Sequence, residues 1–164
     1  MELNQIHELY LSCSAISTDT RNIETGAMFF ALKGPSFNGN KYALNAIDKG
    51  AKFAIVDEVS VPLNDKIIQV DDVLTTLQDL ARFHREYLGL PIIALTGSNG
   101  KTTTKELINK ILQQRYKTIA TNGNLNNHIG VPLTLLRMTI DTEIGIVEMG
   151  ANHAKEIELL CHIA

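Results

Sequence analysis

The sequence contains no tryptophan, only two cysteines and only four prolines in 164 residues, and aromatic residues make up 5% of it. Cys13 and Cys161 lie far apart and form no CxxC pair, and the five histidines show no metal-ligand spacing. These patterns indicate neither a disulfide framework nor a zinc site. No apolar run reaches the roughly 18 to 20 residues that span a bilayer, and residues 1–10 lack the layout of a signal peptide. We therefore expect a cytoplasmic protein without a membrane partner.

An excess of basic charge is also absent. The chain has 15 Lys and Arg against 18 Asp and Glu, a net charge of -3, so it lacks the surplus with which proteins bind the phosphates of nucleic acids. Its hydrophobic content of 45% is enough for one medium domain or two small ones. We expect a folded protein with no nucleic-acid partner.

Strands and helices alternate along the first half of the chain. The apolar run at residues 27–32 is typical of a strand that is buried on both faces. Apolar spacing and turn residues then predict a helix at 42–49 that stops at Gly50, strands at 52–56 and 67–70, and a helix that is capped by Asp71 or Asp72 and ends before Gly89.

A domain boundary is expected at the turn residues Gly89 and Pro91, because a new strand–helix unit opens directly after them. The predicted elements beyond this point are a short strand of the buried type at 92–96, a buried strand at 144–147 and a helix at 154–164. The fold class is therefore α/β, with one domain at residues 1–89 and a second at residues 90–164.

The most informative segment is TGSNGKTTT, at residues 96–104. Its glycines let the backbone wrap around a phosphate, the amides of the next helix point at that phosphate, and Lys101 with the hydroxyl of Thr102 supplies charge and a magnesium ligand. An apolar strand precedes the segment. A helix with Leu107, Ile108, Ile111 and Leu112 on one face is expected to follow it.

The spacing departs from the usual phosphate loop, which has four residues between its first glycine and the Gly-Lys pair. Here Gly97 leaves only two. A glycine-rich turn that caps a helix is the alternative, but Gly-Lys-Thr at a strand-to-helix junction is uncommon without a phosphate. We interpret the segment as a phosphate loop.

Two more segments contain residues that could bind a nucleotide or its magnesium ion. The strand at 144–147 delivers Glu148 to the carboxyl end of a parallel sheet, where a carboxylate can hold the magnesium of a nucleotide. The asparagine-rich loop includes Asn126 and Asn127, whose amides could reach phosphate oxygens or sugar hydroxyls, although a surface loop also favours asparagine.

Taken in order, these motifs resemble those of the Mur ligases. TGSNGKTT is similar to their shortened phosphate loop, and the two stretches GNLNNHIGVPLT (123–134) and EMGANH (148–153) resemble the branch of the family that adds D-alanyl-D-alanine. Residues 17–21 and 26–42 are similar to the family's uridine-binding part. One departure is Ala154-Lys155-Glu156, where a glycine usually precedes the acid, so the next helix is expected to start differently.

The resemblance implies a small N-terminal α/β module that binds a uridine nucleotide, followed by a partial phosphate-loop-type parallel α/β domain that binds ATP. It implies ATP-dependent ligation of D-alanyl-D-alanine to UDP-N-acetylmuramoyl tripeptide through an acyl phosphate, with ATP and Mg²⁺ as cofactors, in a protein that is monomeric when full length. Further metal-binding and catalytic parts of the family lie beyond residue 164, so this chain is expected to be an inactive fragment.

The site residues carried over from the resemblance fall into four groups. The catalytic residues are Lys101 and Glu148; the ATP-binding residues are Gly97, Ser98, Asn99, Gly100, Lys101, Thr102, Thr103, Asn126 and Asn127; the substrate-binding residues are Thr18, Thr20, Arg21, Pro35, Ser36 and Phe37; and the metal ligands are Thr102 and Glu148.

Turn chemistry alone would also account for the first of the substrate segments, because Ser-Thr-Asp-Thr is common where a strand runs into a turn. Three other functions stay open: another Mur-type ligase, a ligase like the folylpolyglutamate synthases, and a nucleotide-binding module without catalysis. A folylpolyglutamate synthase lacks the uridine-binding module, and the base-reading motif of guanine-nucleotide switches does not occur in this sequence.

Overall fold

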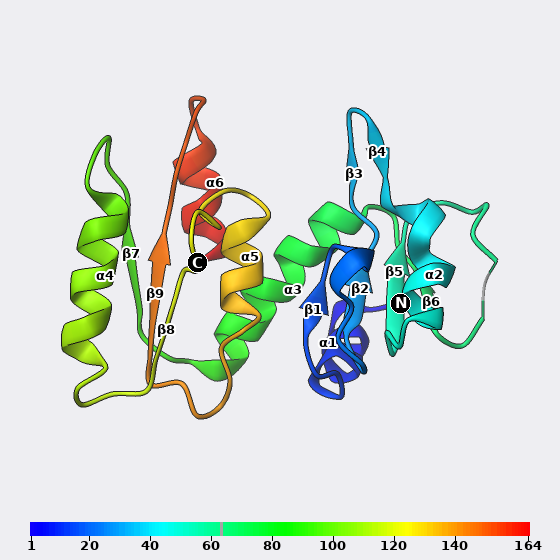
Figure 1. The fold of residues 1–164 in the computed structure, drawn as a ribbon, viewed down its shortest axis with the longest axis horizontal. Helices are drawn as coiled ribbons and strands as arrows, with labels where there is room; N and C mark the ends of the chain where they lie inside the picture. Colours follow the sequence, from blue (N-terminus) through cyan, green and yellow to red (C-terminus); the bar gives the residue numbers. More distant parts are fainter. Residues whose placement is uncertain (63) are drawn as a thin grey trace. The chain divides into compact units, whose positions relative to one another are not determined.

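The structure is a computed structural model that describes residues 1–62 and 64–164. It divides into two units, Met1–Leu77 and Gln78–Ala164, which are described separately here (Figure 1). The division falls inside helix α3 (Val73–Leu88). The sequence-based boundary lies directly after the end of that helix, at Gly89, and its position stays a prediction.

The first unit is built on a parallel sheet with the strand order β1-β2-β5-β6. Its strands are β1 (Ile16–Ser17), β2 (Met28–Phe30), β5 (Phe53–Val56) and β6 (Ile67–Gln69), and a separate antiparallel hairpin consists of β3 (Lys33–Gly34) and β4 (Phe37–Asn38). The helical segments are α1 (Leu3–Leu11), η1 (Thr20–Asn22), η2 (Gly39–Tyr42) and α2 (Ala43–Asp48).

Burial of the apolar run explains why β2 lies inside this sheet. All three of its residues are buried, and neighbouring strands pair with it on both sides. Phe29 packs in a core cluster with alanines of α2 and with Ala54 and Val56 of β5. The predicted strands at 27–32, 52–56 and 67–70 and the predicted helix at 42–49 are therefore confirmed.

The second unit contains a three-stranded parallel sheet in the order β7-β9-β8, formed by β7 (Ile92–Leu95), β9 (Ile144–Glu148) and β8 (Thr118–Ala120). Its helices are α4 (Lys101–Leu112), α5 (Gly130–Leu135) and α6 (Glu156–Ile163). Figure 1 shows α4 on one side of this sheet and α5 and α6 on the other. The central strand β9 is the most buried of the three, as its apolar sequence predicts.

The expectation that the strand at 92–96 is of the buried type is wrong, and two apolar residues of α4 are exposed. The outer face of α4 carries Leu107 and Ile111, which are 58% and 70% exposed, while Lys105 is the buried residue of the helix. Strand β7 is an edge strand whose residues are exposed or half-buried, with Ile93 36% exposed. The strand order accounts for the exposure of β7, because β9 rather than β7 occupies the middle of the sheet.

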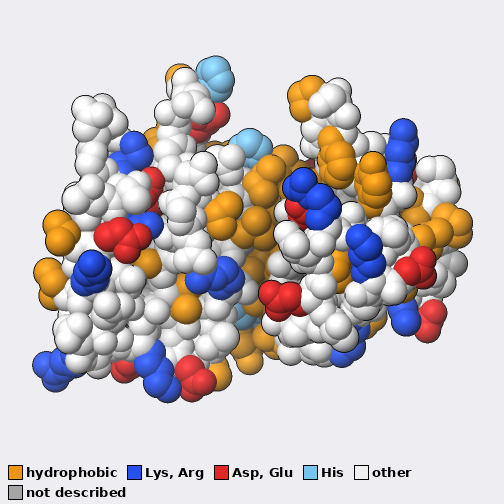
Figure 2. Space-filling model, in the orientation of Figure 1, with side chains coloured by type: hydrophobic (Ala, Val, Ile, Leu, Met, Phe, Trp, Pro, Cys, Tyr) orange, Lys and Arg blue, Asp and Glu red, His pale blue; other side chains and the backbone are white. Residues whose placement is uncertain are grey.

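The surface drawn in Figure 2 shows basic and acidic side chains interspersed with one another. This distribution accords with the small net charge of -3. Among the described residues, no helix is both long enough and apolar enough to cross a membrane.

Candidate functional site

The predicted phosphate loop lies between β7 and α4, as the sequence pattern requires. Gly100 immediately precedes the helix in the left-handed conformation, with φ of 76°, which glycine adopts without steric cost. Lys101 is the first residue of α4, and its Nζ donates to the carbonyl oxygen of Gly97 at 2.6 Å. The loop is thus folded back on itself at a helix N-terminus, where unpaired amides favour an anion.

Glu148 is the last residue of β9, and it is the register partner of Leu95 in the neighbouring strand β7. Because parallel strands end at the same edge of a sheet, Glu148 lies beside the start of the phosphate loop. Glu148 is only 1% exposed. The sequence-based placement of this carboxylate at the carboxyl end of a parallel strand is therefore confirmed.

The carboxylate of Glu148 is only half satisfied. Its Oε1 accepts a hydrogen bond from Asn126 Nδ2 at 2.9 Å, while its buried Oε2 has no partner among the residues that the structure describes. A buried oxygen without a partner costs free energy, so such atoms commonly mark the place of a ligand, an ion or water. Carboxylate and hydroxyl oxygens are ligands that Mg²⁺ accepts, and Mg²⁺ needs only one or two carboxylates when phosphates and water complete its shell.

The residues present therefore fit a magnesium ion held by Glu148 and the hydroxyl of Thr102 together with nucleotide phosphates. The described part of the chain has no group of three or more His, Cys, Asp or Glu side chains that could hold a metal by itself. A resident metal cage is thus not built here, and the donor set suits an ion that arrives with a nucleotide.

The two candidate asparagines turn out to do different things. Asn126 contacts Glu148, whereas the Oδ1 of Asn127 accepts from the amides of Ile129 and Gly130 at 3.1 and 2.9 Å and so satisfies the start of α5. Gly150 allows Asn126 to approach, since a Cβ at position 150 would lie 3.0 Å from the Asn126 amide.

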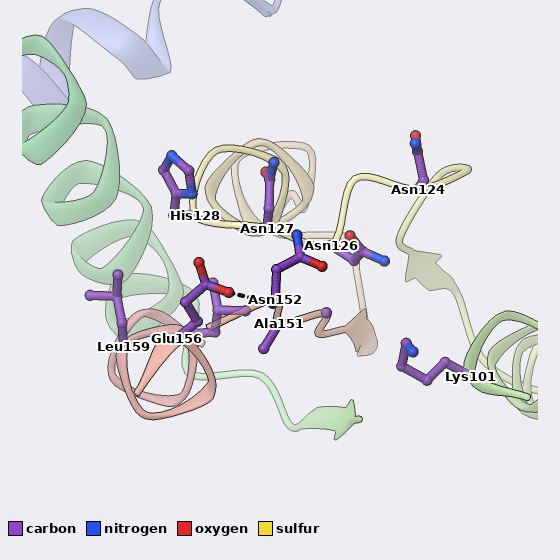
Figure 3. A pocket seen from close by; sticks show the side chains of 11 residues that line it. Lys101, Asn124, Asn126, Asn127, His128, Ala151, Asn152, Glu156 and Leu159 are labelled. Carbon is purple, nitrogen blue, oxygen red and sulfur yellow. Dashed lines mark hydrogen bonds between the residues drawn. The ribbon is translucent and has the colours of Figure 1, made fainter. Parts of the chain in front are cut away.

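A cavity of about 410 Å³ opens next to these groups (Figure 3). Of the predicted site residues, Lys101, Asn126 and Asn127 line it; the remaining lining residues are Asn124, His128, Gly150, Ala151, Asn152, Glu156, Leu159 and Leu160. The other loop residues and Glu148 do not line this cavity. Glu148 is hydrogen-bonded to Asn126, which does line the cavity.

Glu156 and Asn152 are cavity residues that the sequence reasoning missed. The carboxylate of Glu156 accepts from the amides of Asn152 and His153 at 2.6 and 3.0 Å, and these bonds lower the pKa of the carboxyl below its ordinary value. An acid in the first turn of a predicted helix was the available signal. The burial of Lys105, which does not line the cavity, was not predicted either, because a lysine in an amphipathic helix is ordinarily exposed.

The two predicted substrate segments of the first unit follow neighbouring parallel strands. Residues 18–21 come after β1, and residues 35–37 form the tip of the hairpin that comes after β2, so both leave the same edge of the sheet. Arg21 pairs with Asp19 through bonds of 2.6 to 3.0 Å and lowers the pKa of that carboxyl to about 2. The turn interpretation of this segment is confirmed, and the substrate-binding roles stay predictions.

The hairpin that carries residues 35–37 is anchored by a buried acid. Asp57 follows β5, its side chain is 2% exposed, and it pairs with Lys33 of β3 at 3.1 Å. It also accepts from Asn40 Nδ2 at 2.8 Å. These bonds hold both ends of the hairpin against the carboxyl edge of the sheet.

The fold and the site together define an α/β protein with a shortened nucleotide-type phosphate loop and a buried carboxylate beside it. Residues 12–85 match the domain described as the Mur ligase family catalytic domain, and residues 95–164 match the Mur ligase middle domain. The chain belongs to the Mur ligase family.

Relatives and solved structures agree with this assignment. The chain is 44% identical over 151 residues to the UDP-N-acetylmuramoyl-tripeptide–D-alanyl-D-alanine ligase of Bacillus subtilis, a match that covers 91% of this chain and 33% of that enzyme. It is 42% identical over 149 residues to the ligase of the same name from Escherichia coli, a match that covers 90% of this chain and 32% of that enzyme. The chain therefore spans about a third of the length of these relatives.

Among solved structures, the UDP-N-acetylmuramoylalanyl-D-glutamyl-2,6-diaminopimelate–D-alanyl-D-alanyl ligase of Acinetobacter baumannii superposes with a TM-score of 0.86 at 34% identity, over 98% of this chain and 39% of that one. The MurF ligase of Thermotoga maritima in complex with ADP superposes with a TM-score of 0.83 at 32% identity, over 94% and 36%. These superpositions confirm the α/β fold with parallel sheets.

Proposed function

We propose that this chain is the substrate-binding and ATP-binding part of a ligase that joins D-alanyl-D-alanine to UDP-N-acetylmuramoyl tripeptide in the synthesis of peptidoglycan precursors. The observation that carries the proposal is the buried, half-satisfied carboxylate of Glu148 at the strand end beside the phosphate loop. The names of the relatives in Bacillus subtilis and Escherichia coli supply the substrates. In this proposal the enzyme acts in the cytoplasm, where UDP-linked precursors of the cell wall are made.

In this proposal the free carboxylate of the tripeptide attacks the terminal phosphate of ATP and forms an acyl phosphate, with ADP as the leaving group. The amine of D-alanyl-D-alanine then attacks the acyl carbon, and an amide and inorganic phosphate result. Phosphoryl transfer of this kind needs positioned reactants and neutralised charge rather than a protein nucleophile.

Each named residue has a role that its position supports. Lys101 and the amides at the start of α4 bind the phosphates, and Thr102 and Glu148 hold the magnesium ion, which neutralises phosphate charge when it is bound. Asn126 orients Glu148 through their hydrogen bond. In the first unit, Thr18, Thr20, Arg21 and the hairpin tip at residues 35–37 bind the uridine diphosphate group.

The test is an NMR titration of the 164-residue chain with ADP in magnesium and, separately, with UDP. We expect ADP to perturb amides of residues 97–103 and UDP to perturb those of residues 18–21 and 35–37. Lys101→Ala should weaken ADP binding about 10- to 100-fold, because a hydrogen bond to a charged group contributes about 1.5 to 3 kcal/mol. Lys110→Ala, an exposed lysine at the other end of α4, is the matched control. UDP effects confined to residues beyond Gly89 would contradict the assignment of the first unit.

A further inference from the structure

Lys105 is a fully buried lysine in a helix whose apolar residues are partly exposed. It has 0% exposed surface and lies four residues after Lys101, one helical turn away on the same side of α4. Its Nζ donates to the carbonyl oxygen of Thr121 at 2.7 Å and pairs with Glu106 Oε1 at 2.9 Å, which lowers the pKa of Glu106. Burial of an ammonium group costs free energy that an apolar side chain in the same place would not cost.

The partner of this lysine is itself connected to Glu148. Thr121 follows β8 and is 2% exposed. Its Oγ1 accepts from the backbone amide of Glu148 at 2.9 Å, and its own amide donates to the carbonyl of Ile146 at 2.9 Å. Thr121 thus holds the C-terminal end of strand β9 through hydrogen bonds with Ile146 and Glu148.

We infer that Lys105 is a positioning residue that sets the placement of Glu148 relative to the phosphate-loop helix. The connection runs from Lys105 to the carbonyl of Thr121 and from the hydroxyl of Thr121 to the amide of Glu148. Since α4 also carries Lys101 and Thr102, this link joins the two halves of the proposed nucleotide–magnesium site. The inference rests on the proposed function, because it gives Lys105 a purpose at that site.

A purely structural lysine would affect stability without changing how nucleotide binding depends on magnesium. The measurement is therefore the affinity for ADP in Mg²⁺ divided by the affinity in EDTA, determined by NMR titration of the 164-residue chain. Lys105→Met and the nearly isosteric Thr121→Val should each reduce this ratio about tenfold and change the affinity in EDTA by less than about twofold. Thr142→Val is the control. The hydroxyl of Thr142 is on a buried residue and accepts from the backbone amide of Thr139, but Thr142 lies just before the start of β9, at the end opposite Glu148.

A second readout does not need the nucleotide at all. In both variants the amide of Glu148 should exchange with solvent at least about tenfold faster than in the parent chain, while the control leaves it unchanged. If Lys105→Met does not fold, Thr121→Val decides the question by the same two measurements. Unchanged magnesium dependence in Thr121→Val overturns the inference.

The Glu148→Gln variant separates this inference from the proposed function. We expect Glu148→Gln to abolish the magnesium enhancement and to leave nothing further for Lys105→Met to remove in the double variant. An enhancement that survives Glu148→Gln, or a parent chain without any enhancement, contradicts the proposed site and the inference with it. An enhancement that Glu148→Gln abolishes but that either Lys105→Met or Thr121→Val retains overturns the inference alone.

Discussion

At the scale of single residues, the backbone of Lys155 has a left-handed conformation that residues with a Cβ rarely adopt. It precedes α6 with φ of 68°, and it is the only non-glycine residue with positive φ among the described residues. In the family that the sequence resembles, a glycine usually precedes the acid that corresponds to Glu156, and this chain has Lys155 there. The backbone here takes the conformation that glycine favours, although the residue is lysine.

Lys155→Gly should therefore stabilise the chain. Relief of the left-handed strain contributes about 1 to 2 kcal/mol, and the greater freedom of glycine in the unfolded chain offsets part of it, so a net gain of about 0.5 to 1 kcal/mol is expected. Urea unfolding followed by circular dichroism measures the change. Lys155→Ala keeps the Cβ and should leave stability nearly unchanged, and a less stable Lys155→Gly would show that the conformation is not strained.

At the scale of elements, the loop before α5 holds two neighbouring asparagines whose side chains make different hydrogen bonds. Asn127 satisfies two amides at the start of that helix, and the amide of Val131 donates to its carbonyl oxygen at 2.9 Å. Asn126 instead reaches across to Glu148. The shared sequence pattern gave both residues the same predicted role, but their hydrogen bonds differ.

Asn127→Ala should accordingly lower the free energy of unfolding by about 1 kcal/mol, the usual cost of removing such a cap. Asn124→Ala in the same loop is the control, because Asn124 is exposed and its replacement should change stability by less than about 0.5 kcal/mol. Equal effects of the two substitutions on the urea midpoint would refute the capping role of Asn127.

At the scale of the whole molecule, the chain covers about a third of its relatives, and its second sheet ends at β7. Strand β7 has no partner on its outer side among the described residues, and Ile93 is partly exposed there. An open strand edge with apolar side chains favours association with other chains.

The 164 residues span about a third of the length of the relatives, so we expect no ligation by these residues alone. The assay is release of phosphate from ATP in the presence of UDP-N-acetylmuramoyl tripeptide and D-alanyl-D-alanine, with the Bacillus subtilis relative as the positive control. The chain should release less than about a hundredth of the control's phosphate, since loss of even one stabilising group costs about a hundredfold or more. Turnover at a rate comparable to that of the relative would show that the catalytic groups all lie within these residues.

Most of the longer elements followed from local patterns. The buried strands β2 and β9 and the helices α2, α3 and α4 were predicted because their apolar spacing or continuous apolar runs are strong signals. The helix α1 and the short strands β1, β3, β4 and β8 were not predicted. These four strands have two or three residues and, unlike β2, do not lie in a long continuous apolar run, so their pairing partners rather than a local pattern define them.

The sequence by itself determined where the phosphate loop lies, that Glu148 ends a buried strand, and that the chain alternates between strands and helices, because each of these depends on neighbouring residues. Only the tertiary structure decided that β9 lies between β7 and β8, that Lys105 is buried and that Asn126 rather than Asn127 contacts Glu148. These features depend on contacts between residues 16 to 53 positions apart, from the bond of Lys105 with Thr121 to the pairing of Leu95 with Glu148. Local spacing does not encode which strand becomes the neighbour of which.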